Sequence, residues 1–464
     1  MPRDTLTAAG AVRAPGAVLL VSCYELGHQP AGLALPLAFL ERAGFAPATV
    51  DLAVDRLDDA MVRRARLVAI SVPMHTALRI GVHAARRIRE LNPAALVVFH
   101  GLYAVLNREF LLDGPADLCL GGEAEPALVA LAERLDRGQP PAAPEVIHLE
   151  RLDYPVPSRR ALPDLRRYAA FEREGERRVA GVVEASRGCL HLCRHCPIPP
   201  VYGGRFFVVP AETVLEDIRR QVALGARHIT FADPDFLNGP GHALKIVAAM
   251  HEEFPALSFD VTAKVEHLLK HRARLPDIAA AGCAFIVTAV ESLSDLVLAR
   301  LDKGHTRADV QRALEATRAA GITLRPSFLP FTPWTTLADY VELVDWLEAE
   351  EMETCVEPVQ LGIRLLIPPG SALLEQPDLA THLRGLDAEA FSYRWEHPDP
   401  RMDQLHRTVS DLVHWANHTR ESATQTLRKV RAAAHQAAGR PLEARATHAE
   451  RRPVAPRLTE PWFC

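Results

Sequence analysis

The sequence has few cysteines and no long apolar run. Eight cysteines occur among 464 residues, and five of them are scattered, at Cys23, Cys119, Cys283, Cys355 and Cys464. Such a distribution argues against a disulfide-stabilised secreted scaffold and favours a reducing compartment. No apolar stretch approaches the roughly 20 residues that a membrane-spanning helix needs, and the N-terminus lacks a long apolar core followed by a cleavage site. We therefore expect a cytoplasmic protein without a membrane partner.

Charge of one sign is not in marked excess either. Charged residues make up 24% of the chain and hydrophobic residues 48%, and the formal net charge is -5. This balance gives no electrostatic reason to expect a nucleic acid or an anionic membrane as a partner. The length allows two or three domains that each bury a core, and no repeat of 20–50 residues is present. The composition therefore indicates a globular protein of several domains.

The other three cysteines form one dense group, Cys189, Cys193 and Cys196, in a C-x3-C-x2-C pattern. Three thiolates on a four-iron cluster leave one iron open to a ligand from outside the protein. A structural zinc ion would need a fourth protein ligand, and the nearest candidates, His191 and His195, have spacings unlike those of paired zinc-finger ligands. The pattern therefore predicts a [4Fe–4S] cluster.

Residues 17–137 alternate between apolar runs and segments of helical spacing. The runs AVLLVS, RLVAIS, ALVVFHG and DLCLGG are typical of buried strands, and ALPLAFLERAGF and HAARRIREL have the period of helices. This alternation predicts a doubly wound, Rossmann-like parallel sheet with helices on both faces. Ligands of such sheets bind at the carboxyl ends of the strands, here near residues 22–28, 71–75, 100–103 and 121–125. Residues 1–16 are expected to be flexible.

A second alternation follows a stretch rich in proline and charge, residues 138–180, which we expect to be a linker. Six apolar runs, VAGVVEAS, HITFAD, LSFDVTA, CAFIVTAV, ITLRPSF and VQLGIRLLI, alternate there with helical segments. They predict a partial (β/α)6 TIM barrel over residues 181–375, followed by a helical extension at 376–440 and a mobile tail at 441–464. The expected fold class is therefore α/β, with a doubly wound domain, a partial barrel and a helical C-terminal extension.

The cysteine loop follows directly on the first expected barrel strand, where loops of barrel enzymes build active sites. In this position it resembles the loop of the radical S-adenosylmethionine (radical SAM) superfamily, and the resemblance covers about residues 180–370. It implies a [4Fe–4S] cluster on Cys189, Cys193 and Cys196 that binds S-adenosylmethionine and cleaves one of its C–S bonds reductively. The chain departs from the family at His195, where an aromatic residue is usual; an imidazole could stack or hydrogen-bond in its place.

The resemblance also implies residues that bind S-adenosylmethionine. Asp233 and Asp235, at the end of the second barrel strand, match the region that contacts the methionyl amino group, although they could equally be loop-capping carboxylates. Glu291 and Ser292 match a G-x-E-S turn that holds the ribose, with alanine in place of the glycine; the alternative is that they cap the next helix.

Three further positions complete this expected site. Arg325, in LRPSF, suits a carboxylate clamp at the end of the fifth strand. Gly362 and Ile363, in the sixth strand candidate, would offer backbone contacts to adenine.

The segment CLGGEAEPALVAL, residues 119–131, resembles the G-E-G-E turn of cobalamin (B12)-binding-like domains attached to radical SAM barrels. The usual D-x-H-x-x-G signature of a cobalt-ligating histidine is absent, and His28 occurs in a different arrangement, CYELGHQPAG. Some family members bind cobalamin without that ligand, so the sequence leaves cobalamin open as a cofactor.

The C-terminal segment LTEPWFC resembles the stretch that leads into the CUAEP or CCAEP tail of certain radical SAM proteins, in which U is selenocysteine. One hypothesis is that a UGA codon read as selenocysteine follows Cys464; the alternative is an unstructured terminus with an incidental cysteine. Cys464 and Cys355 are the candidate catalytic residues, because soft sulfur or selenium ligands near the barrel mouth could bind arsenic or selenium. Cys355 could instead be an inert buried thiol.

The leading hypothesis is an enzyme that modifies a small molecule after reductive cleavage of S-adenosylmethionine, with a flavodoxin or ferredoxin-type electron donor. The tail suggests an arsenic or selenium compound and transfer of the 3-amino-3-carboxypropyl group. The alternatives are a cobalamin-dependent radical SAM methyltransferase and a non-catalytic iron–sulfur or corrinoid sensor.

Overall fold

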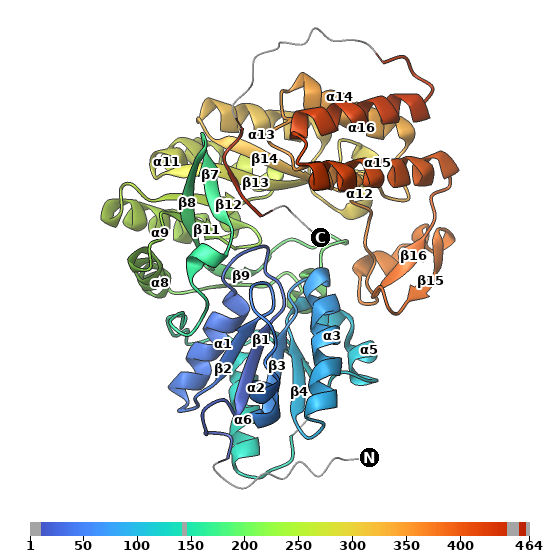
Figure 1. Ribbon diagram of the computed structural model, residues 1–464. Coiled ribbons are helices and arrows are strands. Elements are labelled where there is room, and N and C mark those ends of the chain that lie inside the picture. Colours follow the sequence, from blue (N-terminus) through green and yellow to red (C-terminus); the bar gives the residue numbers. More distant parts are fainter. Residues whose placement is uncertain (1–10, 142–145, 443–453, 461–464) are drawn as a thin grey trace.

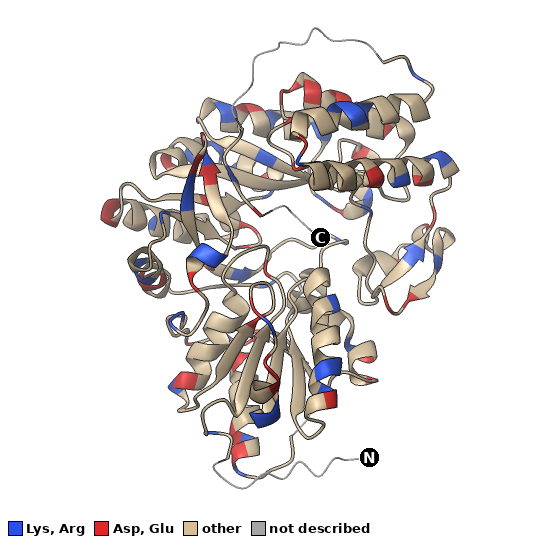
Figure 2. Ribbon diagram, in the orientation of Figure 1, with Lys and Arg blue, Asp and Glu red and all other residues tan. Residues whose placement is uncertain are grey.

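The computed structural model describes residues 11–141, 146–442 and 454–460 and consists of two α/β parts with a helical C-terminal extension. Figure 1 shows the N-terminal sheet in blue below the second sheet, in green to orange, with two long red helices beside the second part. Lysine, arginine, aspartate and glutamate are interspersed along the helices, whereas the strands of the N-terminal sheet are mostly uncharged (Figure 2).

The N-terminal part is a parallel sheet of strand order β2-β1-β3-β4-β5-β6, with helices between the strands. Its elements are β1 (Val18–Ser22), α1 (Ala31–Arg42), β2 (Ala48–Asp51), α2 (Asp59–Arg64), β3 (Leu67–Ser71), α3 (His75–Leu91), β4 (Leu96–His100), α4 (Leu102–Leu106), α5 (Arg108–Leu112), β5 (Leu118–Gly122), α6 (Glu125–Asp136) and β6 (Ile147–His148). The expected doubly wound fold is therefore confirmed.

The strand β1 shows why this sheet is covered on both faces. All five of its residues are buried. Leu19 and Val21 belong to one apolar cluster, whereas Val18 and Leu20 belong to another. Because successive side chains of a strand point to opposite faces, a run that is apolar at every position needs helices on both sides.

The second part is built on a seven-stranded sheet of order β14-β13-β12-β11-β8-β7-β17, in which β8 and β11 to β14 run parallel. Its elements are η1 (Leu165–Arg167), β7 (Ala170–Arg173), β8 (Glu176–Val183), β9 (Ser186–Gly188), α7 (Pro199–Tyr202), β10 (Phe206–Val208), α8 (Ala211–Ala223), β11 (His228–Phe231), η2 (Phe236–Asn238), α9 (Pro240–Glu253), β12 (Ser258–Thr262), α10 (Val265–Lys270), η3 (Arg272–Arg274), α11 (Leu275–Ala280), β13 (Cys283–Glu291), α12 (Asp295–Leu301), α13 (Arg307–Ala319), β14 (Thr323–Phe328), α14 (Leu337–Ala349) and η4 (Pro358–Gly362).

The sixth expected barrel strand does not form as a full strand. The run VQLGIRLLI begins in the 3-10 helix η4, and its remaining sheet contact is one parallel bridge between Phe331 and Arg364. Pro358 has no N–H for a ladder, and the side chain of Gln360 accepts a hydrogen bond from the backbone N–H of Phe328 at the end of β14. A side chain thus occupies the place of a ladder bond, and the partial barrel has five full parallel strands.

Several short strands lie in ranges for which none was expected. β2 was not predicted, and β6, β7 and the first residues of β8 lie within the stretch 138–180 that we expected to be a linker. Within the expected tail, β17 (Arg457–Leu458) pairs with β7 in antiparallel orientation. These strands are short or lie at sheet edges, so they have little of the periodicity on which the prediction rests.

The C-terminal extension consists of η5 (Ala372–Glu375), η6 (Leu379–Thr381), the hairpin β15 (Leu383–Asp387) and β16 (Ser392–Trp395), and the helices α15 (Pro400–Thr419) and α16 (Ala423–Ala437). A helical extension was predicted over this range, and the hairpin was not. Among the helices of the described ranges, none has both the length and the apolar character that crossing a membrane requires.

A buried ion pair ties the two parts together. The Arg159 guanidinium contacts the Asp217 carboxylate of α8 at 2.7 Å, and both side chains are almost fully buried, with 3% and 4% exposed. The same guanidinium donates to the side-chain oxygen of Gln29 at 3.0 Å and to the carbonyl of Val182 at 2.7 Å. One cation therefore joins the loop after β1, the connecting segment, α8 and β8.

We expect Arg159→Ala to lower the stability of the whole chain by about 3–5 kcal/mol, because it leaves the Asp217 carboxylate buried without its cation. Urea denaturation followed by circular dichroism measures the loss as a lower midpoint. Arg42→Ala is the matched control: Arg42 pairs with Asp153 at 3.1 Å with 45% and 97% of the side chains exposed, and such a pair contributes about 1 kcal/mol or less. Equal effects of the two variants would contradict the prediction.

Candidate functional site

The three clustered cysteines lie on the connection of a β-hairpin. The hairpin strands β9 and β10 pair in antiparallel orientation, with Gly188 opposite Phe206. The backbone N–H of Cys189 donates to the carbonyl of Arg205 at 3.1 Å, so the loop begins where the ladder ends. The hairpin follows directly on β8, the first parallel strand, which sets the loop at the carboxyl end of the barrel sheet.

Gly188 permits the sharp entry into this loop. Its φ is +76°, and a Cβ atom there would lie 2.4 Å from the carbonyl oxygen of Arg205 and 2.6 Å from the Tyr202 ring. Both the left-handed backbone and the close approach require glycine. The residue before the first cysteine is therefore fixed by the geometry of the hairpin.

The cysteine thiols fit a metal cluster. Cys189 and Cys193 are buried, Cys196 is partly buried, and all three are free thiols. Burial, with a smaller contribution from the nearby Cys193 and Cys189, raises the pKa of Cys196 to about 12, so the three sulfurs lie close enough to act on one another. Thiols in this state bind a cation by releasing protons. The donor set therefore suits an iron–sulfur cluster, as predicted from the spacing.

His195, which replaces the usual aromatic residue, binds to the barrel. Its Nε2 lies 3.2 Å from Oε1 of Glu291 at the end of β13, and the same oxygen lies 3.3 Å from Nζ of Lys303. Burial alone would raise the pKa of Glu291, but Lys303 and His195 hold it at about 2. Glu291, with a φ of +66°, thus holds the loop between the second and third cysteines, and its role as a ribose contact stays a prediction.

The two carboxylates after β11 are also engaged within the chain. Asp233 accepts hydrogen bonds from the backbone N–H of Ala185 at 2.9 Å and from the hydroxyl of Ser186 at 2.5 Å. Burial raises the pKa of Asp233 to about 7. Asp235 accepts from the backbone N–H of Leu237 at 3.1 Å and so caps η2. These contacts match the loop-capping alternative, and a role of either carboxylate toward S-adenosylmethionine stays a prediction.

Ser292 and Arg325 likewise have partners inside the chain. The hydroxyl of Ser292 accepts from the backbone N–H of Ser294, the residue before α12. Arg325 is a carboxylate clamp, as expected from its chemistry, but the carboxylate is Glu357 of the same chain, at 2.8 Å. Its guanidinium also donates to the carbonyl of Pro456 at 3.2 Å, which fastens the segment that carries β17.

The remaining expected site residues lie elsewhere. A Cβ on Gly362 would lie 3.6 Å from the Ser410 hydroxyl of α15, so this glycine faces the C-terminal helix, while the carbonyl of Ile363 accepts from the N–H of Phe331. Cys355 lines a cavity of about 560 Å³ together with the amino end of β14, away from the carboxyl ends where the cysteine loop lies. Cys464 lies outside the described residues.

A cluster of buried charges that sequence reasoning missed joins the cysteine loop to the N-terminal sheet. Arg187, on β9, contacts Glu125 at 2.9 Å, Glu184 at 3.2 Å and Glu123 at 3.4 Å. Glu123 also accepts hydrogen bonds from Tyr154 at 2.6 Å and Tyr202 at 3.0 Å. No local pattern marks Arg187, since its partners Glu123 and Glu125 are more than 60 positions away in the sequence. They do lie in the G-E-A-E turn that the sequence singled out.

The carboxyl edge of the N-terminal sheet is therefore turned toward the cysteine loop. At this edge, Nε2 of His100, the last residue of β4, and Nε2 of His148, the last residue of β6, are buried without a hydrogen-bond partner. Burial lowers the pKa of His100 to about 4, so its imidazole is neutral at pH 7. Two buried nitrogens that lack partners suit a polar ligand at this edge, which is where doubly wound sheets bind theirs.

The sequence of the second part matches the family model of the radical SAM superfamily over residues 183–347. The chain carries a radical SAM domain. This confirms the resemblance seen in the cysteine spacing, and the superfamily implies a [4Fe–4S] cluster and S-adenosylmethionine as cofactors of this radical SAM protein.

Two curated relatives match different shares of this chain. The hopanoid C-3 methylase of Methylococcus capsulatus is 25% identical over 334 residues, which is 68% of this chain and 64% of the methylase. The tRNA-2-methylthio-N(6)-dimethylallyladenosine synthase of Desulfosudis oleivorans is 27% identical over 179 residues, which is 37% of this chain and 38% of the synthase. The chain thus spans less than two thirds of the length of either relative.

Two solved structures share the arrangement of both parts. The radical S-adenosylmethionine methyltransferase TsrM from Kitasatospora setae, with tryptophan and an S-adenosylmethionine analogue bound, has a TM-score of 0.55 at 21% identity and covers 72% of this chain and 71% of its own. The cobalamin-dependent S-adenosylmethionine radical enzyme OxsB, with aqua-cobalamin bound, has a TM-score of 0.62 at 16% identity and covers 86% of this chain and 66% of its own. At these identities the likeness supports the fold, a cobalamin-binding-like sheet followed by a partial barrel.

We expect Cys193→Ala to abolish the iron–sulfur chromophore of this radical SAM protein, because two thiolates cannot hold the cluster that three bind. The visible absorption spectrum and the iron content after anaerobic reconstitution measure the loss. Cys283→Ala is the matched control, since Cys283 is a buried thiol at the start of β13. A Cys193→Ala protein that retains wild-type iron content would contradict the cluster assignment.

Glu25, at the same edge of the N-terminal sheet, makes the stability of the folded chain depend on pH. Burial, followed by the nearby Glu184 and Asp51, raises the pKa of Glu25 to about 8. Between its unfolded value of about 4.3 and this folded value, the folded chain keeps a proton that the unfolded chain releases. Stability therefore falls as the pH rises through this interval, by up to about 1.4 kcal/mol per pH unit.

We expect Glu25→Gln to remove this loss, so that the variant gains more stability over the wild type at about pH 8 than at about pH 5. Urea denaturation midpoints at the two pH values measure the gain. Glu41→Gln, on the exposed side of α1, is the matched control. A gain from Glu25→Gln that is the same at both pH values would contradict the prediction.

Proposed function

We propose that this radical SAM enzyme binds cobalamin at the carboxyl edge of its N-terminal sheet and transfers a methyl group from S-adenosylmethionine to a small molecule. The observation that carries the proposal is the contact of Arg187 with Glu123 and Glu125. Because Arg187 lies two residues before Cys189 and the glutamates follow β5, a ligand at this edge faces the cysteine loop. Methyl transfer is supported by the similarity to the hopanoid methylase and to the methyltransferase TsrM, and cobalamin by the similarity to the cobalamin-dependent enzyme OxsB.

Cys189, Cys193 and Cys196 would hold the cluster, and the unpartnered nitrogens of His100 and His148 would face the cobalamin. When bound, these groups supply a single electron and a carrier for a methyl group. The residues of the chain itself provide position and charge. Burial would lower the pKa of Lys303, but Glu291 and, to a smaller extent, the nearby Cys193 and Cys196 raise it. Its ammonium would therefore stabilise the negative charge of cysteine thiolates.

The preference for 3-amino-3-carboxypropyl transfer to an arsenic or selenium compound is revised. It rested on the C-terminal tail, and Cys464 lies outside the described residues. None of the relatives and structures named above is named for an activity of that kind, whereas several are named for methyl or methylthio transfer. The small-molecule substrate itself stays unassigned.

The buried free thiols and the cysteine cluster suit a reducing compartment, for which we propose the cytoplasm. The electron for the cluster would come from a flavodoxin or ferredoxin-type donor. Dithionite can replace such a donor in the test that follows.

We expect the anaerobically reconstituted protein, supplied with hydroxocobalamin, dithionite and S-adenosylmethionine, to form S-adenosylhomocysteine together with 5′-deoxyadenosine. The first product reports methyl transfer and the second reports reductive cleavage. Liquid chromatography with mass spectrometry identifies both. Cys193→Ala should form neither product above background, because its cluster is missing.

Three outcomes would contradict the proposal in different ways. Methylthioadenosine as the main product would indicate 3-amino-3-carboxypropyl transfer instead. 5′-Deoxyadenosine without S-adenosylhomocysteine, and independent of cobalamin, would indicate radical chemistry without methyl transfer. A protein that holds its cluster and forms no product under strong reduction would be better described as a sensor.

A further inference from the structure

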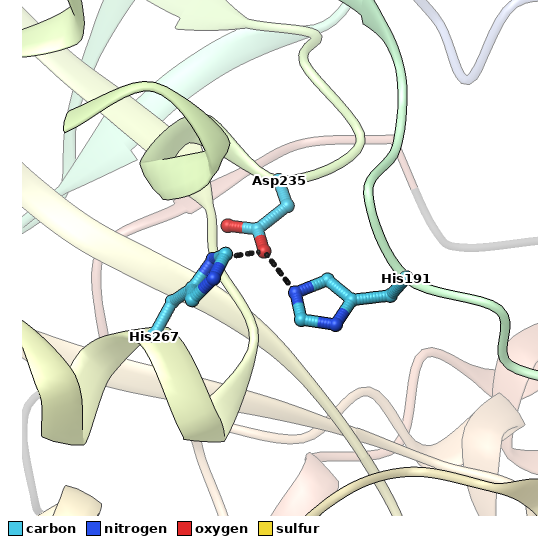
Figure 3. A group of neighbouring side chains, drawn as sticks. All are labelled: His191, Asp235 and His267. Atoms are coloured by element: carbon cyan, nitrogen blue, oxygen red, sulfur yellow. Dashed lines mark ion pairs between the residues drawn. The ribbon is translucent and has the colours of Figure 1, made fainter. Parts of the chain in front are cut away.

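Two buried side chains and one partly buried side chain converge beside the cysteine loop. His191 lies in the loop between Cys189 and Cys193, Asp235 follows β11, and His267 lies on α10. Figure 3 shows both imidazole rings pointing toward the same carboxylate oxygen of Asp235. Nδ1 of His267 lies 2.6 Å from this Oδ2, and Nε2 of His191 lies 3.5 Å from it. One atom from each residue falls within 4.8 Å of the other two.

These three atoms lack the geometry of ordinary hydrogen bonds. Asp235 Oδ2, His267 Nδ1 and His191 Nε2 are each buried without an aligned hydrogen-bond partner, although the distances are those of ion pairs. The Asp235 side chain is fully buried, and those of His267 and His191 are 7% and 15% exposed. Buried polar atoms are rarely left without a partner, so their mutual approach calls for a group that binds all three.

From this arrangement we propose that His191, Asp235 and His267 bind a divalent first-row transition-metal cation, separate from the iron–sulfur cluster. Two imidazoles and one carboxylate are the donor set of catalytic zinc sites and of non-haem iron(II) sites, and both leave coordination positions open. Metal–ligand bonds of about 2.0–2.2 Å separate adjacent ligand atoms by roughly 3–3.5 Å. The two separations from Oδ2 of Asp235, 2.6 and 3.5 Å, need a shift of only a few tenths of an ångström to match, and the two histidine nitrogens lie within 4.8 Å of each other.

Polar groups next to His191 and Asp235 resemble the outer partners that orient metal ligands in proteins. The other ring nitrogen of His191, Nδ1, lies 3.7 Å from Oε2 of Glu266, and Glu266 lies 3.6 Å from Nζ of Lys264. The second oxygen of Asp235 accepts the backbone N–H of Leu237. The hydrogen bond from Leu237 orients the Asp235 carboxylate, and the Glu266 carboxylate is placed on the side of His191 from which metal sites orient a ligating histidine.

The bound cation would fasten the cysteine loop to the barrel. Its ligands come from the loop itself, from the turn after β11 and from the first turn of α10. His191 is two residues from each of Cys189 and Cys193, so an ion at this point would hold the loop between the first two cysteines.

The experiment is metal analysis of the cluster-loaded full-length protein after dialysis against excess zinc chloride and then against metal-free buffer. We expect about one zinc per chain that is lost in His267→Ala and in Asp235→Asn, with the cluster chromophore retained. His271→Ala is the matched control, because its ring lies 5.9 Å from that of His267 and outside the three ligands. Glu266→Gln should weaken zinc binding by about tenfold or more. Zinc uptake that His267→Ala and Asp235→Asn leave unchanged would overturn the proposal.

A second measurement covers the case in which these variants lose the cluster as well. In a full-length protein with Cys189→Ser, Cys193→Ser and Cys196→Ser, cobalt(II) can bind without thiolates. We expect visible d–d absorption of cobalt held by nitrogen and oxygen ligands, and its loss when His267→Ala is added but not when His271→Ala is added. The absence of cobalt absorption in this triple-serine protein would equally overturn the proposal.

Discussion

The structure depends on one buried cation, Arg187, where the two sheets meet. It lies on β9, two residues before the first cluster cysteine, and it binds one carboxylate from the barrel strand region and two from the turn after β5. Glu123 is fully buried and Glu125 nearly so, and removing a buried partner of this kind leaves charges that the interior cannot solvate. The position of the cysteine loop relative to the N-terminal sheet is thus fixed by an ionic contact that neither part could satisfy alone.

The loop itself is held at the residues between its ligands. The backbone N–H of Arg194 donates to the carbonyl of Leu301, and the His195 ring binds Glu291. His191, between the first two cysteines, lies against Asp235 and His267. Each spacer segment of C-x3-C-x2-C thus has its own attachment to the barrel. The thiols can therefore converge before any metal binds, which lowers the entropy that a flexible loop would lose on binding.

How much of this could be predicted from the sequence depends on whether the determining contacts are local. The cysteine spacing and its place after a buried strand are local, and they predicted the loop and the cluster, while the local alternation of apolar runs and helical segments predicted the barrel. The capping role of Asp235 toward Leu237 is local too, and it was one of the two alternatives. The partner of Arg325 was not predictable, because a clamp suited to a substrate carboxylate looks the same in sequence as one that binds Glu357.

The prediction of a sixth barrel strand over the run VQLGIRLLI was wrong for a different reason. A short apolar run can be a buried strand or a buried turn of helix, and only its neighbours decide between them. Here the side chain of Gln360 bonds the end of β14, and Gly362 packs against α15, so the C-terminal helix covers the place of a sixth strand.

The internal partners of Asp233, Asp235 and Glu291 have a consequence for how S-adenosylmethionine would be held. All three carboxylates expected to contact it are already engaged by Ser186, Leu237, His195 or Lys303. A ligand that displaced any of these partners would leave a buried donor unsatisfied, at a cost of about 1–3 kcal/mol each. Contacts that add to the existing hydrogen bonds are therefore favoured over contacts that replace them. A carboxylate can do this, since its two oxygens together accept up to about four hydrogen bonds. The engaged carboxylates can therefore act as rigid acceptors whose direction is set before the ligand arrives.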